Sequence, residues 1–233
     1  MMRQHLIKKQ KQIQEMRSDF YTSRGTHVFF KDDLENTEID PEIVVAKVES
    51  KLPDHLLSEL EMIVIGEFDE FKERHINAFY KDGILHVSNI QDNEKDLIDD
   101  IVHEIAHSIE EPYGYQIYGD QEIKAEFLRK RKILHDKLWA LGHKAPLEWF
   151  MNTEYDQEFD EFLLKTIGYD KLRMICMGLF ISAYAPTSLR EYFATGFTDF
   201  YLYPNHNFLE KMSPALTKKL ILLQDIKNLD NTL

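Results

Sequence analysis

The chain contains a single cysteine, Cys176, among its 233 residues. One cysteine cannot form an intrachain disulfide, and its isolation excludes a metal site built from several thiolates. Any metal ion must therefore be held by histidine, aspartate or glutamate side chains.

Long apolar runs and an excess of positive charge are also missing. The closest candidate for a membrane span, MICMGLFISAYA at 174–185, is too short to cross a bilayer. The first residues lack the apolar core of a secretory signal, so we expect a protein that is not exported by that route. Lys and Arg number 28 against 41 Asp and Glu, which gives a net charge of −13. This charge repels phosphate backbones and anionic lipids, and we expect neither nucleic acid nor membrane as a partner.

The first part of the chain predicts a small β-sheet. The stretch 26–31 alternates weakly as a strand does, and Pro41 then marks the start of a helix. A β-branched run at 61–68 predicts a second strand, and the Asp-Gly pair at 82–83 is typical of a tight hairpin turn. We therefore expect a sheet-containing lobe at residues 26–108.

Beyond residue 108 the apolar spacing becomes helical. Helices are predicted over four ranges: 120–141, 155–166, 170–184 and 188–202. We expect a mostly helical lobe at residues 109–233, so that the fold class of the whole chain is α+β.

The N-terminal stretch differs in character from both lobes. Residues 4–19 are rich in Lys and Gln, with apolar residues at roughly helical spacing. We expect residues 1–25 to form a polar helix. It is either a docking arm for a protein partner or a loosely packed chain end.

The most informative stretch is IVHEIAHSIEE at 101–111. On a helix His103 and His107 lie side by side and can reach one cation, while Glu104 lies one step round the helix. This is the HExxH pattern of zinc peptidases. The apolar residues that we expect to bury the other sides of this helix are Ile98, Ile101, Val102, Ile105 and Ile109. The alternative is a half-buried helix whose histidines only form hydrogen bonds.

A catalytic zinc ion needs a third protein ligand and an open position for water. The metzincin class has a glycine and a histidine three and six residues after His107, where this chain has Glu110 and Tyr113, so that class is excluded. Glu126 stands at a spacing found in zinc aminopeptidases. It lies in a charged stretch, however, and can pair with Lys130 on a solvated helix face.

Glu191 is the second candidate for the third ligand. It opens an aromatic-rich helical stretch, and its alternative role is a capping box with Ser188 at the start of that helix. Spacing alone does not decide between Glu126 and Glu191.

The segment YAPTSLREYFATGF around Glu191 resembles the closing motif of the anthrax lethal factor-like and Pro-Pro endopeptidase gluzincins. In that family a tyrosine stands seven residues before the ligand glutamate, and Tyr184 matches this position. The order of strand, helix, strand, hairpin and HExxH is similar as well, and the likeness covers roughly residues 26–223. The resemblance implies a zincin-like domain over residues 26–233.

The resemblance also implies a zinc metalloendopeptidase, with Zn²⁺ held by His103, His107 and Glu191. Glu104 would act as the general base towards the zinc-activated water, and Tyr184 would donate a hydrogen bond to the oxyanion. Members of the family often carry a second acidic residue four positions after the ligand glutamate, where this chain has threonine. Known members are exported, whereas this chain is expected to be cytoplasmic or associated with a phage.

A peptide or protein is the expected substrate. An extended peptide would pair through its backbone with the strand that precedes the HExxH helix. The four residues of that strand expected to bind it are Ile84, Leu85, His86 and Val87. The rival hypothesis is a binding or structural component, for example of a phage particle, that keeps a zincin fold with little activity. An intact general base at Glu104 and an intact Tyr184 favour the enzyme.

Overall fold

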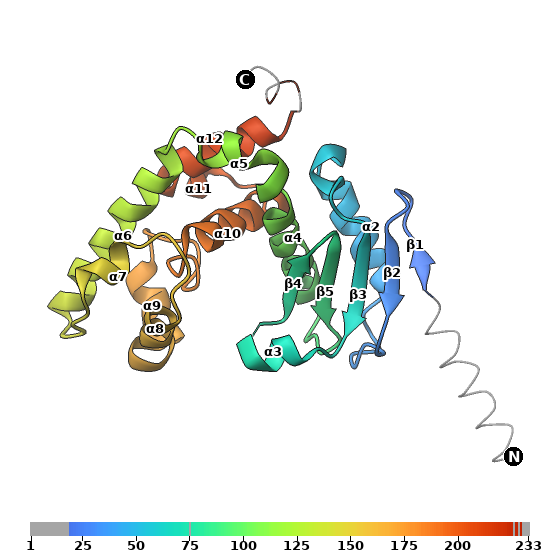
Figure 1. Ribbon diagram of the computed structural model, residues 1–233, viewed down its shortest axis with the longest axis horizontal. Helices are drawn as coiled ribbons and strands as arrows, with labels where there is room; N and C mark the ends of the chain where they lie inside the picture. The colour runs from blue at the N-terminus through green and yellow to red at the C-terminus, as the bar shows by residue number, and fades with distance from the viewer. Residues whose placement is uncertain (1–18, 75, 226, 228, 230–233) are drawn as a thin grey trace, which may run out of the picture. The chain divides into compact units, whose positions relative to one another are not determined.

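The residues that this computed structural model describes are 19–74, 76–225, 227 and 229. The chain divides into two compact units, Met1–Ser108 and Ile109–Leu233 (Figure 1). The N-terminal helix expected over residues 1–25 lies mostly outside the described residues. Where that stretch is described, it contains a short strand, β1 (Phe20–Tyr21).

The first unit contains a five-stranded mixed sheet in the order β1-β2-β3-β5-β4 (Figure 1). The other strands are β2 (His27–Phe30), β3 (Met62–Gly66), β4 (Ala78–Lys81) and β5 (Ile84–Ser88). The pairs β2–β3 and β3–β5 are parallel, and the outer pairs β1–β2 and β4–β5 are antiparallel. Two short helices complete this part of the unit, η1 (Asp54–Leu57) and α3 (Asp69–Arg74).

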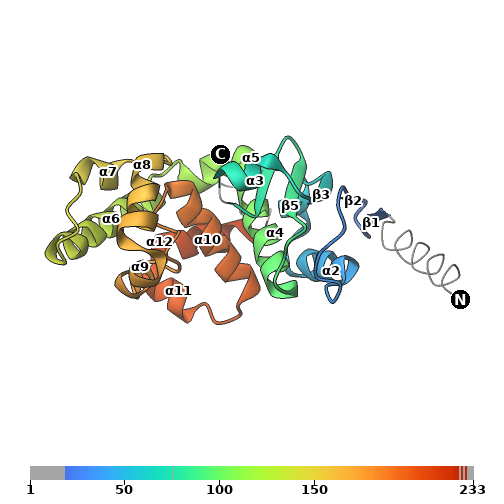
Figure 2. The same ribbon diagram turned by 90° about the horizontal axis from the view of Figure 1, so that it is seen from below.

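One face of the sheet forms the core of this unit. Strand side chains point alternately to the two faces, and those at every second position of β3 and β5 are fully buried: Ile63, Ile65, Leu85 and Val87. Two helices, α2 (Pro41–Lys51) and α4 (Glu94–Ser108), lie on the same side of the sheet, and α4 contacts α2, β4 and β5 (Figure 2). The apolar face of the sheet therefore fixes α4 in place.

The predicted start of α2 is confirmed. Asp40 is the N-cap residue, and its side chain accepts hydrogen bonds from the backbone N–H groups of Glu42 and Ile43. Pro41 takes the first helical position, where its missing N–H costs no hydrogen bond.

The predicted hairpin is also present. Asp82 and Gly83 connect β4 to β5 with φ values of 50° and 82°, the left-handed conformation that the Asp-Gly pair favours. This turn makes β5 an internal strand, paired with β3 on one edge and with β4 on the other. No described strand pairs with the outer edge of β4, which is thus an edge strand.

The second unit is helical in the described residues. Its elements are α5 (Glu110–Tyr118), α6 (Glu122–Ala140), α7 (Leu147–Met151), α8 (Gln157–Glu161), the π-helix η2 (Phe162–Ile167), α9 (Tyr169–Cys176), α10 (Leu189–Leu202), α11 (Asn207–Met212) and α12 (Pro214–Leu223). The long helix α6 contacts α5, α7, α9, α10 and α12, so it forms the centre of this unit.

The helices expected over 120–141 and 188–202 are confirmed by α6 and α10. The helix expected over 170–184 is wrong in its second half, because α9 ends at Cys176 and turns follow up to the start of α10. Gly178 has a φ of 72°, which does not continue a right-handed helix. Tyr184 therefore lies on a turn segment.

The two units together give an α+β architecture, as the element pattern predicts. Within the part of the chain that the structure describes, no helix combines the length and the apolar character needed to cross a membrane.

Candidate metal centre

The HExxH stretch lies in the second half of α4. The helix begins after Asn93, whose side-chain oxygen accepts hydrogen bonds from the N–H groups of Lys95 and Asp96 at 2.9 and 3.1 Å. Its buried side consists of Leu97, Ile101, Val102, Ile105 and Ala106. The apolar frame expected from the sequence thus exists, although Ile98 is only half-buried.

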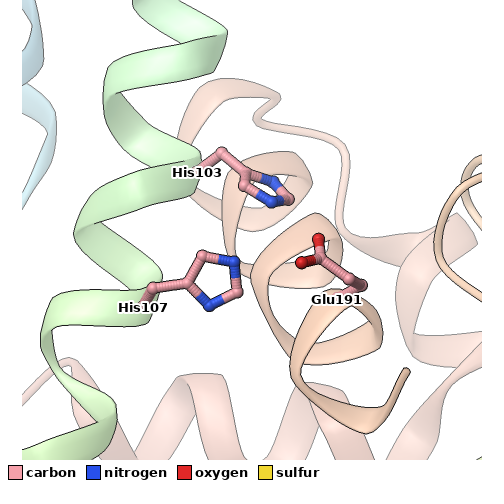
Figure 3. A group of neighbouring side chains, drawn as sticks. All are labelled: His103, His107 and Glu191. Carbon is pink, nitrogen blue, oxygen red and sulfur yellow. The ribbon is translucent and has the colours of Figure 1, made fainter. Parts of the chain in front are cut away.

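His103, Glu104 and His107 are half-buried, on the side of α4 that the core does not enclose. The ring centroids of His103 and His107 are 5.1 Å apart, and the ring planes are inclined by 78°. Both rings project from the same side of the helix (Figure 3). A packed helix thus holds two imidazole groups close to each other.

Glu104 is held at the edge of the sheet. Its Oε2 accepts a hydrogen bond of 2.9 Å from the backbone N–H of Tyr80 in β4. That N–H points away from β5, because neighbouring residues of an antiparallel strand direct their backbone groups alternately to the two edges. No sequence pattern reveals such a contact, since its donor is a backbone group from another element.

Glu191 lies in the first turn of α10. Ser188 is the N-cap residue, and its Oγ accepts a hydrogen bond of 3.1 Å from the N–H of Glu191. The adjacent Arg190 forms an ion pair with Glu110 at the start of α5. The cap expected at Ser188 is therefore present, and together with the ion pair it fixes the backbone that carries Glu191.

His103, His107 and Glu191 form a group that can hold a metal ion (Figure 3). Each offers one ligand atom, an imidazole nitrogen or a carboxylate oxygen, and these atoms all lie within 4.8 Å of one another. Two ligands bound at about 2.1 Å to a tetrahedral ion lie about 3.4 Å apart. Two imidazoles and one carboxylate are a ligand set that zinc accepts.

The other candidate ligand, Glu126, has a different role. The solvated helix face expected for it is wrong, because its side chain is only 3% exposed. Its carboxylate accepts hydrogen bonds from the hydroxyl of Tyr192 at 2.8 Å and from the N–H groups of Ala215 and Leu216 at 2.9 and 3.2 Å. Glu126 thus caps the start of α12, where free N–H groups attract a negative charge.

Tyr184 lies on the turn segment that leads to α10. The Oγ of Ser182 accepts hydrogen bonds from the N–H groups of Tyr184 and Ala185 at 3.3 and 3.0 Å. The ring of Tyr184 meets that of Tyr169 edge to face, with centroids 6.5 Å apart. Burial raises the pKa of the Tyr184 phenol, and the negative charge of Glu191 raises it further. The hydroxyl therefore keeps its proton at neutral pH.

The expectation that a peptide pairs with Ile84, Leu85, His86 and Val87 is wrong. These residues belong to β5, whose two edges are occupied by β3 and β4. A backbone that already pairs on both sides has no N–H or C=O groups left for a further strand. The sequence places these residues correctly in a strand before α4, but the order of strands in a sheet depends on pairing between distant segments.

Comparison with known proteins adds no assignment: the chain matches no family model, no curated protein and no solved structure.

Proposed function

We propose that the chain is a zinc-dependent endopeptidase of the zincin type. In this proposal His103, His107 and Glu191 are the zinc ligands, Glu104 is the general base, and Tyr184 stabilises the oxyanion. The observation that supports it most directly is the meeting of the two HExxH histidines with a glutamate that lies 84 residues beyond His107 in the sequence.

The proposal assigns the hydrolytic chemistry to a small set of groups. A zinc ion in this ligand set would act as a Lewis acid and lower the pKa of a water molecule that it binds. Glu104 accepts a proton from the attacking water on one carboxylate oxygen and later returns it to the leaving amine. The hydrogen bond from the N–H of Tyr80 holds the other oxygen and thereby orients the carboxylate.

Tyr184 supplies a hydrogen-bond donor for the tetrahedral intermediate. Its raised pKa keeps the phenol protonated, as a donor must be. The turn at Ser182 and the contact with Tyr169 limit the positions of the ring. A donor held in advance near the developing negative charge lowers the barrier more than it strengthens substrate binding.

The edge strand β4 supports a peptide as substrate. Its outer edge carries the carbonyl group of Tyr80, whose N–H already donates to Glu104, and, by the same alternation, the backbone groups of Ala78. An extended peptide that added itself to this edge would run beside Glu104, which already contacts the N–H of Tyr80. This placement replaces the one expected on β5.

Zinc content and peptide cleavage, measured together on the purified full-length chain, test the proposal. We expect one zinc ion per chain, cleavage of members of a peptide library, loss of zinc in His103→Ala, and loss of cleavage with zinc retained in Glu104→Gln. A chain that takes up no zinc would contradict the proposal. Zinc uptake without cleavage of any peptide would favour the binding component instead.

A further inference from the structure

Two aspartates stand immediately before the HExxH motif on α4. Asp99 precedes His103 by four residues and Asp100 precedes it by three. Helical side chains lean towards the N-terminus of the helix, so the ring of His103 lies over the turn that carries both carboxyls.

Asp100 already has a structural partner. Its Oδ2 accepts a hydrogen bond of 3.0 Å from Nε2 of Gln91, a buried side chain that also donates to the carbonyl of Ser88 at 3.2 Å. These contacts connect α4 to the segment that follows β5. The role of Asp100 is thus to hold the backbone before the helix.

Asp99 differs from Asp100 in one respect. Its Oδ2 lies 3.9 Å from Nζ of Lys95, towards solvent. Its Oδ1 is buried and accepts no hydrogen bond from any residue that the structure describes. A buried carboxylate oxygen without a donor costs free energy, so such an atom needs a partner in some state of the protein.

We infer that Asp99 is a positioning residue for His103. In the metal-loaded protein, Oδ1 of Asp99 accepts a hydrogen bond from the ring N–H of His103. A neutral imidazole has one N–H and one lone pair, so this bond fixes the tautomer and directs the lone pair to the metal. A carboxylate behind a histidine ligand also makes that ligand more basic. The inference rests on the proposed function only in that His103 is a zinc ligand.

Zinc affinity of the full-length chain, measured by competition with a chromogenic chelator, tests this role. We expect Asp99→Ala to weaken zinc binding by about 10- to 100-fold, the usual effect of losing such a partner. Asp99→Asn should weaken it less, because the amide oxygen still accepts a hydrogen bond. The absorption bands of the Co²⁺-substituted protein should shift in both variants, since the position of the His103 ring changes.

Asp96→Asn is the matched control. Asp96 lies on the same helix, and its Oδ2 accepts a hydrogen bond from Asn93 at 2.8 Å near the helix start. Its replacement removes the same charge, and we expect a change of less than about threefold in zinc affinity, because Asp96 is half-buried on a turn of α4 nearer the helix start than Asp99 and lies about two helical turns before His103.

The outcomes separate the positioning role from the proposed function. Zinc affinity equal to wild type in both Asp99 variants, together with loss of zinc in His103→Ala, would overturn the positioning role alone. Zinc affinity that His103→Ala does not change would overturn the ligand assignment itself. A purely structural role for Asp99 predicts a lower melting temperature of the metal-free protein with unchanged zinc affinity, and this result would also contradict the inference.

Discussion

At the scale of single residues, the position of Glu104 suits the general base that we propose. It directly follows His103, a proposed zinc ligand, and the N–H of Tyr80 fixes one of its oxygens. Glu104→Gln keeps an oxygen that accepts this hydrogen bond but removes the group that accepts a proton. We therefore expect unchanged zinc content and folding, with a rate of peptide cleavage lower by at least about 100-fold.

A steady-state cleavage assay with zinc analysis of the same sample checks this prediction. The exposed Glu111, changed to Gln, is the matched control and should retain wild-type rate. Wild-type rate in Glu104→Gln would show that another group accepts the proton.

Tyr184→Phe removes one hydroxyl and keeps the ring. If the hydroxyl binds the oxyanion, kcat falls by roughly 10- to 1,000-fold while KM barely changes, because the hydrogen bond matters mainly in the transition state. Tyr169→Phe removes a hydroxyl from the neighbouring ring, which donates to Asp160 at 3.3 Å, and should change kcat by less than about threefold. Kinetics and melting temperature are measured on each sample. An unchanged kcat with a lowered melting point in Tyr184→Phe would assign Tyr184 to the core.

At the scale of helices, the contact between α6 and α12 explains why Glu126 is not available as a ligand. Glu126→Ala leaves the N–H groups of Ala215 and Leu216 without an acceptor inside the protein. Each such group costs about 1–3 kcal/mol, so the free energy of unfolding should fall by at least that amount. Denaturant unfolding measures the loss, and zinc analysis below the transition should give the wild-type content. Loss of zinc from the folded variant would return Glu126 to the ligand set.

The contact between α6 and α12 also makes the free energy of unfolding depend on pH. Burial lowers the pKa of Lys130 from 10.5 to about 8, although the charge of Glu126 opposes this effect. Between these two pH values the unfolded chain binds more protons than the folded one, so the free energy of unfolding rises with pH. The gain across this window is about 3 kcal/mol at most.

Urea unfolding between pH 7.5 and 10 measures this rise. Lys130→Met, which has no titratable group at that position, should show a flatter profile, whereas the exposed Lys211, changed to Met, should leave the wild-type slope. Parallel profiles for wild type and Lys130→Met would mean that the buried amine does not titrate in this range.

At the scale of the whole molecule, local patterns predicted the elements well and the long-range contacts poorly. The hairpin follows from one Asp-Gly pair, and α4 from the apolar spacing around His103, because both signals lie within a few residues. The solvated environment expected for Glu126 failed because its partners stand in α10 and α12, far along the chain. Strand order has the same non-local origin, and for this reason the sequence does not reveal that both edges of β5 are already paired.

The proposed ligand set shows what sequence and structure each contribute. The HExxH spacing indicates the two histidines. Spacing alone does not decide between Glu126 and Glu191 as the third ligand, and the family resemblance favours Glu191. His103, His107 and Glu191 form a group that could hold a metal ion, whereas the carboxylate of Glu126 accepts hydrogen bonds from the start of α12. The stretch DDIVHEIAH already indicates that Asp99 lies next to His103, because residues four apart on a helix are neighbours.

Anomalous scattering at the zinc absorption edge, from crystals of the zinc-loaded protein, identifies the zinc ligands directly. We expect one strong anomalous peak within about 2.2 Å of a nitrogen of His103, a nitrogen of His107 and a carboxylate oxygen of Glu191. A peak bound by Glu126, or a zinc ion held without either histidine, would contradict it.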